Sequence, residues 1–393
     1  MNAPFIPASA GRDQRLDVFR GLALITIFIN HVPGNLYENF TSRNFGFSDA
    51  AEAFVLMSGI AVGLAYSRGF QSGSLRSACM KIWRRAGLLY ITHIVTSVMA
   101  IGLVAAGALY LGVFEMLSRI NFGPLLTKPL QTMVGLPLLG HQLGYFNILP
   151  LYAALLIISP LYILVGLRSP LALIGLAIGV WMLAGMFRIN LPNYPNPGGW
   201  FFNPVSWQLI FAIGIAGGLC MLEGRRLVPY RAWFFWLCSA FLIFSYVWIA
   251  LRAGALPGRR MLPFFIAGFD KTFLSLPRLL HALALAYVLV NLTFISRMFR
   301  WRVFRPVELM GQNGLAVFAT GSVLAIALQI LRLRFEPNLL SDAFLLVGGL
   351  AIQYGVARFL ALQKSERKPV GKAAGNGFIA APVEKEKLRE SVL

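Results

Sequence analysis

The chain has 393 residues, of which 58% are hydrophobic and only 13% are charged, and its mean hydropathy is +0.69. A soluble globular chain carries about 25% charged residues, so this composition excludes a soluble domain and indicates a polytopic membrane protein. The net charge of +20 comes from basic residues clustered between apolar runs, which is typical of a membrane anchor and not of a nucleic-acid binder. Three scattered cysteines show neither metal-ligand spacing nor a disulfide pattern, so we expect no metal and no bound cofactor.

Ten apolar runs are long enough to predict membrane-spanning helices, and the expected fold is therefore an all-α integral membrane protein. They cover about 18–34, 50–67, 83–113, 147–167, 171–187, 206–222, 232–251, 277–297, 311–331 and 340–362. When the N-terminus is placed inside, 23 of the 35 basic residues fall in inner segments, so both termini are predicted to be cytoplasmic. This organisation predicts one membrane domain over residues 1–363 and a disordered, charged cytoplasmic tail over 364–393. Three long outer loops, at about 114–146, 188–205 and 252–276, are expected to cap a cavity together.

The first predicted helix carries two candidate functional residues, Arg20 and His31, which lie eleven residues apart. Eleven steps of ~100° return a helix to within about 20° of its starting face, and a rise of ~1.5 Å per residue separates the side chains by roughly 16 Å. A cation near the inner surface and an imidazole deeper in the membrane would then face one substrate path, with His31 as the general base. The plainer alternatives are an interfacial histidine and a structural ion pair between Asp17 and Arg20.

The second predicted helix begins with Ser48, Asp49 and Glu52, whose spacing predicts a capping box at its N-terminus. This end and His31 are both predicted at the outer side of adjacent helices. Asp49 or Glu52 is therefore also a candidate to orient the imidazole and raise its basicity, as in a catalytic dyad.

Cations also mark the third and eighth predicted helices. Lys81, Arg84 and Arg85 precede the third helix, where they either anchor the chain at the inner surface or clamp the phosphates of a nucleotide-containing acyl donor. Arg278 and His281 lie three residues apart on the outer part of the eighth helix, where they either bind an anionic or sugar substrate or snorkel to the interface.

Several stretches of the sequence carry a family resemblance. They are RLDVFRGLA at 15–23, HVPGN at 31–35, NFGFSDAAEAFV at 44–55 with Ser58 and Gly59, and residues 148–152, 203–209, 278–286 and 311–318. Together these stretches resemble the OpgC family of inner-membrane acyltransferases, which succinylate osmoregulated periplasmic glucans and are similar to the wider acyltransferase-3 superfamily. The superfamily pattern of a basic residue, ten intervening positions and a histidine matches Arg20 and His31. Its paired arginines match only loosely, because Lys81 stands in place of the first.

The resemblance implies a membrane O-acyltransferase of a bacterial inner membrane that moves a succinyl group from cytoplasmic succinyl-CoA to glucan hydroxyls. The acyl-CoA is then a co-substrate, its phosphates meet Arg20, Lys81, Arg84 and Arg85, and His31 deprotonates the acceptor hydroxyl. Outer-loop residues such as Asn147 and Trp200 would hold the glucan, since aromatic rings cover sugar faces. The free carboxylate of a succinyl group would need a cation, for which Arg43, Arg188 and Arg278 are candidates.

Two alternative functions remain open from the sequence. An O-acetyltransferase acting on another envelope glycan would share the mechanism but not the substrate. A transporter or flippase would instead use intramembrane polar residues to line a solute path, namely Gln208, His281, Gln353 and Arg358. Because no inverted repeat is evident in the sequence, the enzyme is favoured over the transporter.

Overall fold

The computed structural model describes residues 13–254 and 261–366. Within these ranges, the chain is a series of helices joined by turns and loops. The long helices are α1 (Gln14–Asn30), α2 (Ala50–Gln71), α3 (Leu75–Leu111), α6 (Ile148–Arg168), α7 (Pro170–Met186), α8 (Pro204–Leu222), α9 (Ala232–Ala250), α11 (Leu276–Asn291), α14 (Gly314–Arg334) and α15 (Leu339–Glu366). The short helices are α4 (Gly123–Thr127), α5 (Pro129–Gly135), α10 (Phe264–Ala267), α12 (Thr293–Met298) and α13 (Arg305–Gln312). Four 3₁₀ turns complete the described chain: η1 (Leu36–Phe40), η2 (Ser42–Asn44), η3 (Phe114–Ser118) and η4 (Arg302–Phe304).

Seven of the described helices, α2, α3, α6, α8, α9, α14 and α15, are long and apolar enough to cross a membrane. The chain is therefore an all-helical membrane protein. Each of the ten predicted spans coincides with a helix, but α1, α7 and α11 have only 16 or 17 residues. The count of ten crossings and the cytoplasmic location of both termini stay predictions.

The helix boundaries differ from the predicted ones where local capping decides them. The first helix covers 14–30 instead of 18–34, because the Asp13 side chain accepts the Arg15 N–H at its start and Asn35 donates to carbonyls at its end. The third helix begins at Leu75, eight residues before the predicted start at 83, because the basic segment that precedes the apolar run is helical as well. The eighth ends at Asn291, where the extended backbone of Leu292 separates α11 from α12. The first residues of the predicted tail, up to Glu366, are helical, and the rest lies outside the described residues.

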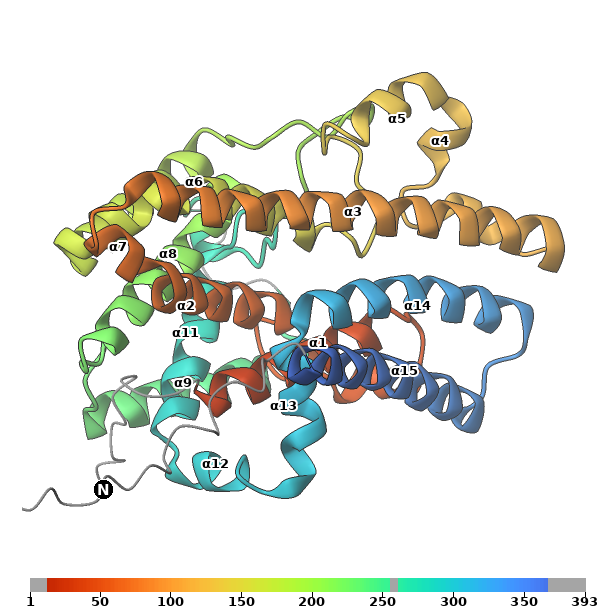
Figure 1. Cartoon of the computed structure of the whole chain (residues 1–393). Coiled ribbons are helices and arrows are strands. Elements are labelled where there is room, and N and C mark those ends of the chain that lie inside the picture. Colours follow the sequence, from red (N-terminus) through yellow and green to blue (C-terminus); the bar gives the residue numbers. More distant parts are fainter. Residues whose placement is uncertain (1–12, 255–260, 367–393) are drawn as a thin grey trace, which may run out of the picture.

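The helices pack in a bundle in which segments far apart in the sequence are neighbours. In Figure 1, α3 runs along α6, and α14 lies beside α15. The α1 helix packs against α13, α2 and α14, and α2 packs most extensively against α8. The α1 and α2 helices therefore reach the centre of the bundle, where their candidate residues meet side chains from the rest of the chain.

Glycines let α2 and α8 approach until their backbones touch. Gly59 and Gly63 on α2 face Gly214 and Gly218 on α8, so each helix contributes two glycines four residues apart. A Cβ atom on Gly59 would lie 2.2 Å from the carbonyl oxygen of Phe211. This is the small-residue packing by which membrane helices associate through close van der Waals contact. It fixes α2, and with it the charged residues at its N-terminus.

We expect Gly214→Ala to lower the thermal stability of the protein, because the added methyl group would lie 2.3 Å from the carbonyl oxygen of Leu56. Overpacking of this kind costs about 1–3 kcal/mol. Gly217→Ala is the matched control on the same helix, since the nearest atom to its new Cβ is Ile60 Cγ1 at 3.9 Å. The measurement is the midpoint of thermal unfolding of each purified variant in detergent, which should be lower for Gly214→Ala than for Gly217→Ala. Equal midpoints would contradict the close contact.

Candidate active site

A cavity of about 590 Å³ lies where the long outer loops meet the ends of α1 and α2. Each of the three predicted loops contributes to its lining, through residues that include Asn121, Tyr145, Trp200, Phe202 and Lys271. His31 and Asp49 line the same cavity from the end of α1 and the start of α2. We call it the outer cavity. Three predicted site residues in addition to His31 are thus brought together here: Asp49, Asn147 and Trp200.

His31 occupies the position directly after the last residue of α1. Its backbone N–H donates to the carbonyl of Ile27 at 2.9 Å, so the residue continues the helical turn and keeps the predicted face. Its ring packs on Tyr145, with 4.7 Å between the ring centroids, and meets Phe318 edge-on at 6.4 Å.

The backbone around Tyr145 is strained in a way that serves this contact. Tyr145 has a φ of 73°, in the left-handed region that non-glycine residues rarely adopt, and Asn121 in the same lining has a φ of 62°. Such conformations cost energy and persist only where the surrounding structure enforces them. From this backbone conformation, the Tyr145 ring packs on the imidazole.

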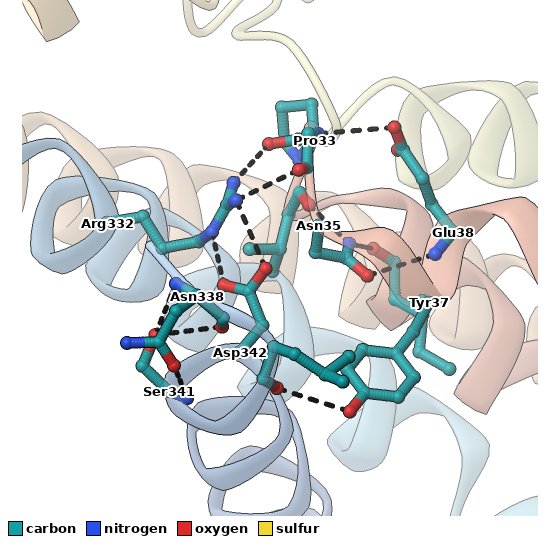
Figure 2. A network of polar contacts seen from close by, with 12 residues as sticks. Pro33, Asn35, Tyr37, Glu38, Arg332, Asn338, Ser341 and Asp342 are labelled. Atoms are coloured by element: carbon teal, nitrogen blue, oxygen red, sulfur yellow. Dashed lines mark hydrogen bonds and ion pairs between the residues drawn. The ribbon is translucent and has the colours of Figure 1, made fainter. Parts of the chain in front are cut away.

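A network of polar contacts fixes the segment that follows His31 (Figure 2). The guanidinium group of Arg332 on α14 donates to the carbonyls of Pro33 at 2.6 Å and Gly34 at 2.9 Å, and it pairs with Asp342 on α15 at 2.6 Å. One turn earlier on α14, Gln329 donates to the carbonyl of His31 itself at 2.7 Å. The candidate base is thus held in place by two helices from the far end of the chain.

Four charged residues form a compensated cluster at the first turn of α2. Arg278 Nη2 lies 2.6 Å from Glu52 Oε1 and 3.2 Å from Asp49 Oδ2, and Lys271 also pairs with Asp49. We call Asp49, Glu52, Lys271 and Arg278 the charge quartet. Burial opposes ionisation of Asp49, but the two cations outweigh it and hold the pKa of that carboxyl well below its usual value.

The predicted capping box is confirmed within this quartet. Asp49 accepts the Ala51 N–H, and Glu52 reaches back to accept the Asp49 N–H, both at 2.9 Å. The remaining hydrogen bonds of the two carboxylates go to Lys271 and Arg278. Among the described residues, no hydrogen bond joins either carboxylate to His31, so the catalytic dyad stays a prediction.

Arg278 and His281 lie behind the wall of the outer cavity and are not part of its lining. The Nδ1 atom of His281 is 2.7 Å from the hydroxyl of Ser48, and both side chains are buried. A Cβ atom on Gly46 would lie only 2.0 Å from the Nε2 atom, so the ring supports the segment before α2 directly. These two predicted acceptor-binding residues therefore contact the start of α2 and the segment before it, and they do not line the outer cavity.

A second, smaller cavity shares Phe318 with the outer cavity and contains two of the four predicted donor-binding cations. This inner cavity has a volume of about 240 Å³, and its lining includes Arg20, Arg85, Ser58 and Tyr152. Phe318 lines both cavities. Arg20 also forms the predicted pair with Asp17, at 3.7 Å. The shared face of α1 therefore serves two adjacent cavities, with Arg20 in one and His31 in the other.

Lys81 and Arg84 lie elsewhere, although the sequence grouped them with Arg85. Both are exposed and line a separate surface groove at the start of α3, together with residues 73–77. A helix turns by ~100° per residue, so adjacent positions such as Arg84 and Arg85 point in different directions. Of the predicted clamp, only Arg85 shares a cavity with Arg20.

The OpgC protein family model matches residues 12–365, a range that includes both cavities, the charge quartet and the Arg332 network. The chain belongs to the OpgC family. Membership of this family connects the protein with the modification of periplasmic glucans. No curated protein sequence and no solved structure matches the chain significantly.

This OpgC protein has two site residues that sequence reasoning did not single out. Lys271 is not among the residues that the sequence marks as candidates, and its contact with Asp49 joins positions 222 residues apart. Phe318 is one of many aromatic residues in apolar runs, and no local pattern marks it as a wall between cavities. Among the described residues, no group of three or more His, Cys, Asp or Glu side chains is placed to hold a metal ion.

We expect Arg332→Met to destabilise this OpgC protein and to reduce its activity, because Asp342, whose side chain is only 5% exposed, would lose its cation. Removing one partner of a buried pair costs about 3–5 kcal/mol. Arg334→Met is the matched control, since Arg334 is exposed two residues further along α14. Thermal unfolding in detergent measures the effect, and unfolding midpoints that fall equally in both variants would show that the network has no special role.

Proposed function

We propose that the protein is an O-acyltransferase of the bacterial inner membrane that moves a succinyl group from cytoplasmic succinyl-CoA to hydroxyl groups of periplasmic glucans. The arrangement of two cavities on either side of Phe318 supports this proposal most. One cavity presents His31, and the other presents Arg20 and Arg85. A donor and an acceptor are able to approach one reaction point from opposite sides of such a protein. Membership of the OpgC family supports a periplasmic glucan as the acceptor.

The inner cavity suits the narrow arm of an acyl-CoA. Arg20 and Arg85 supply positive charge for phosphate groups, and guanidinium groups bind phosphate in a bidentate manner. Small residues in the lining, Ala61, Ala65, Gly311 and Gly314, leave a slot instead of a wide chamber. We therefore assign donor binding to Arg20 and Arg85, and we assign Lys81 and Arg84 to the inner membrane surface.

The outer cavity suits a saccharide. Its lining carries the side-chain amides of Asn30, Asn121, Gln142, Asn147 and Asn193, which both donate and accept hydrogen bonds as sugar hydroxyls require. The rings of Tyr145 and Trp200 add apolar surface that fits the faces of a sugar ring. Its volume of about 590 Å³ lies in the range of small-ligand sites, so it would hold only a short part of a glucan.

The reaction needs one base and no covalent intermediate on the enzyme. His31 takes the proton of a glucan hydroxyl, and the oxygen attacks the thioester carbonyl carbon. The C–S bond then breaks, an ester forms on the glucan, and the thiolate of CoA leaves with the proton that His31 returns. An acetyltransferase acting on another envelope glycan would use the same steps, so the product must be identified directly.

The transporter alternative loses support because the polar residues proposed for a solute path are engaged elsewhere. Gln208 accepts a hydrogen bond from Tyr162 and donates one to the carbonyl of Ala177, both at 2.8 Å. Gln353 donates to its own helix at Gly349, and Arg358 is exposed on α15. Neither these three residues nor His281 contribute to the lining of the inner or outer cavity.

We expect His31→Ala to abolish succinylation while the protein still folds, because no other group replaces the base. Mass spectrometry of periplasmic glucans from cells lacking the protein tests this, after complementation with wild type or the variant. Only wild type should restore the increment of about 100 Da that one succinyl group adds.

The same experiment separates the succinyltransferase from the acetyltransferase and the transporter. It requires that the folded variant is present in the membrane in the same amount as the wild type. If another envelope glycan loses an acyl group while the glucans are unchanged, the mechanism stands and the acceptor is wrong. If no glycan loses an acyl group in the deleted strain, the enzyme proposal fails and transport becomes the leading hypothesis.

We expect Arg85→Gln to raise the KM for acyl-CoA about tenfold, because a hydrogen bond to a charged group contributes about 1.5–3 kcal/mol. Arg84→Gln is the matched control, since it removes the same charge one position earlier on a side chain that faces the surface groove. Initial rates with purified protein and varied acyl-CoA measure both constants. Equal increases in the two variants would show that the inner surface charge as a whole, and not the inner cavity, attracts the donor.

A further inference from the structure

We propose that Lys271 binds the free carboxylate of a dicarboxylic acyl group and thereby selects succinyl donors over neutral acyl donors. This inference rests on the proposed acyl transfer and adds a carboxylate site within the outer cavity. A succinyl group carries its carboxylate at the end of a short ethylene chain, so the cation that binds it must lie close to the reacting carbonyl. Lys271 lines the outer cavity together with His31.

The other candidate cations are less well placed. Arg278 lies between Glu52 and Asp49 and is not part of the cavity lining. Arg188 stacks on the ring of Phe264, with 4.4 Å between Cζ and the ring centroid, and it does not contribute to the lining either. Arg43 does line the cavity, but its side chain is 45% exposed and pairs with Glu38 at 3.5 Å.

Lys271 is able to take a new anion because the charge quartet would remain compensated. Asp49 Oδ2 contacts both Lys271 and Arg278, and Asp49 Oδ1 accepts the Ala51 N–H. When the ammonium group turns toward an acyl carboxylate, Asp49 therefore keeps a cation and a backbone donor. No buried carboxylate is left unpaired, which would otherwise be strongly destabilising. A lysine also has three donors on a flexible stem, so it is able to contact two carboxylates together.

The surroundings of Lys271 hold its backbone and give the ammonium an apolar wall. The backbone carbonyl of Lys271 accepts the indole N–H of Trp207 at 2.9 Å, which ties the residue to the first turn of α8. Its Nζ atom lies 5.4 Å from the ring centroid of Phe202 and 5.9 Å from that of Phe201. These rings attract the cation by their π faces and hold the ammonium group at the cavity wall.

The test compares two acyl donors of equal length with purified wild-type and variant protein. Succinyl-CoA carries a carboxylate where butyryl-CoA carries a methyl group, and glucans extracted from cells lacking the protein serve as the acceptor. We expect Lys271→Met to lower kcat/KM for succinyl-CoA about tenfold or more, as the loss of a charged hydrogen bond predicts. Its kcat/KM for butyryl-CoA should stay unchanged or rise. Arg43→Met is the control and should change both donors by the same small factor.

Each outcome supports or overturns the assignment. Partial recovery of succinyl preference in Lys271→Arg, with none in Lys271→Met, supports a carboxylate site, since only the former keeps the charge. Equal loss with both donors in Lys271→Met shows that Lys271 merely supports Asp49, and this overturns the carboxylate site while the proposed function stands. A wild-type protein that transfers neither acyl group overturns the proposed function and the carboxylate site together.

Discussion

The structure depends on the neutralisation of two carboxylates buried at the first turn of α2. Glu52 is fully buried and the side chain of Asp49 is 18% exposed, and charges in such places persist only when they are paired. Their cations come from positions more than 200 residues further along the chain, so the pairing forms only when α11 and the segment before it are in place. One set of ion pairs therefore joins α2, α11 and the loop that carries Lys271, and it defines one wall of the outer cavity.

The α1 helix then organises the rest of the site. It carries Arg20 toward the inner cavity and His31 toward the outer cavity, and the Arg332 network binds the segment that follows His31. Under the proposed function, this arrangement would separate two chemical tasks along one element. Phosphate recognition and proton transfer would take place in different cavities, at a spacing set by the rise of a helix. A rigid element holds such groups more precisely than a loop does.

Sequence reasoning located the elements whose signals are local. The spacing of Arg20 and His31, the capping box at Asp49 and Glu52, and the loops around the outer cavity are each visible in a short stretch of residues. It failed where a side chain's direction or a distant partner decides the outcome. Arg84 and Arg85 are neighbours in sequence but face different cavities, and Lys271 and Phe318 gain their positions only from contacts made across the fold.

The ring of Phe318 between the two cavities has a consequence for the membrane itself. Two water-filled cavities placed end to end would form a continuous path, through which protons and small ions would leak down their gradient. An aromatic ring that is only 4% exposed interrupts that path with apolar surface, which ions cross at great cost. Under the proposed function, this apolar barrier would limit ion leakage through a protein that takes its donor and its acceptor from opposite sides of the membrane.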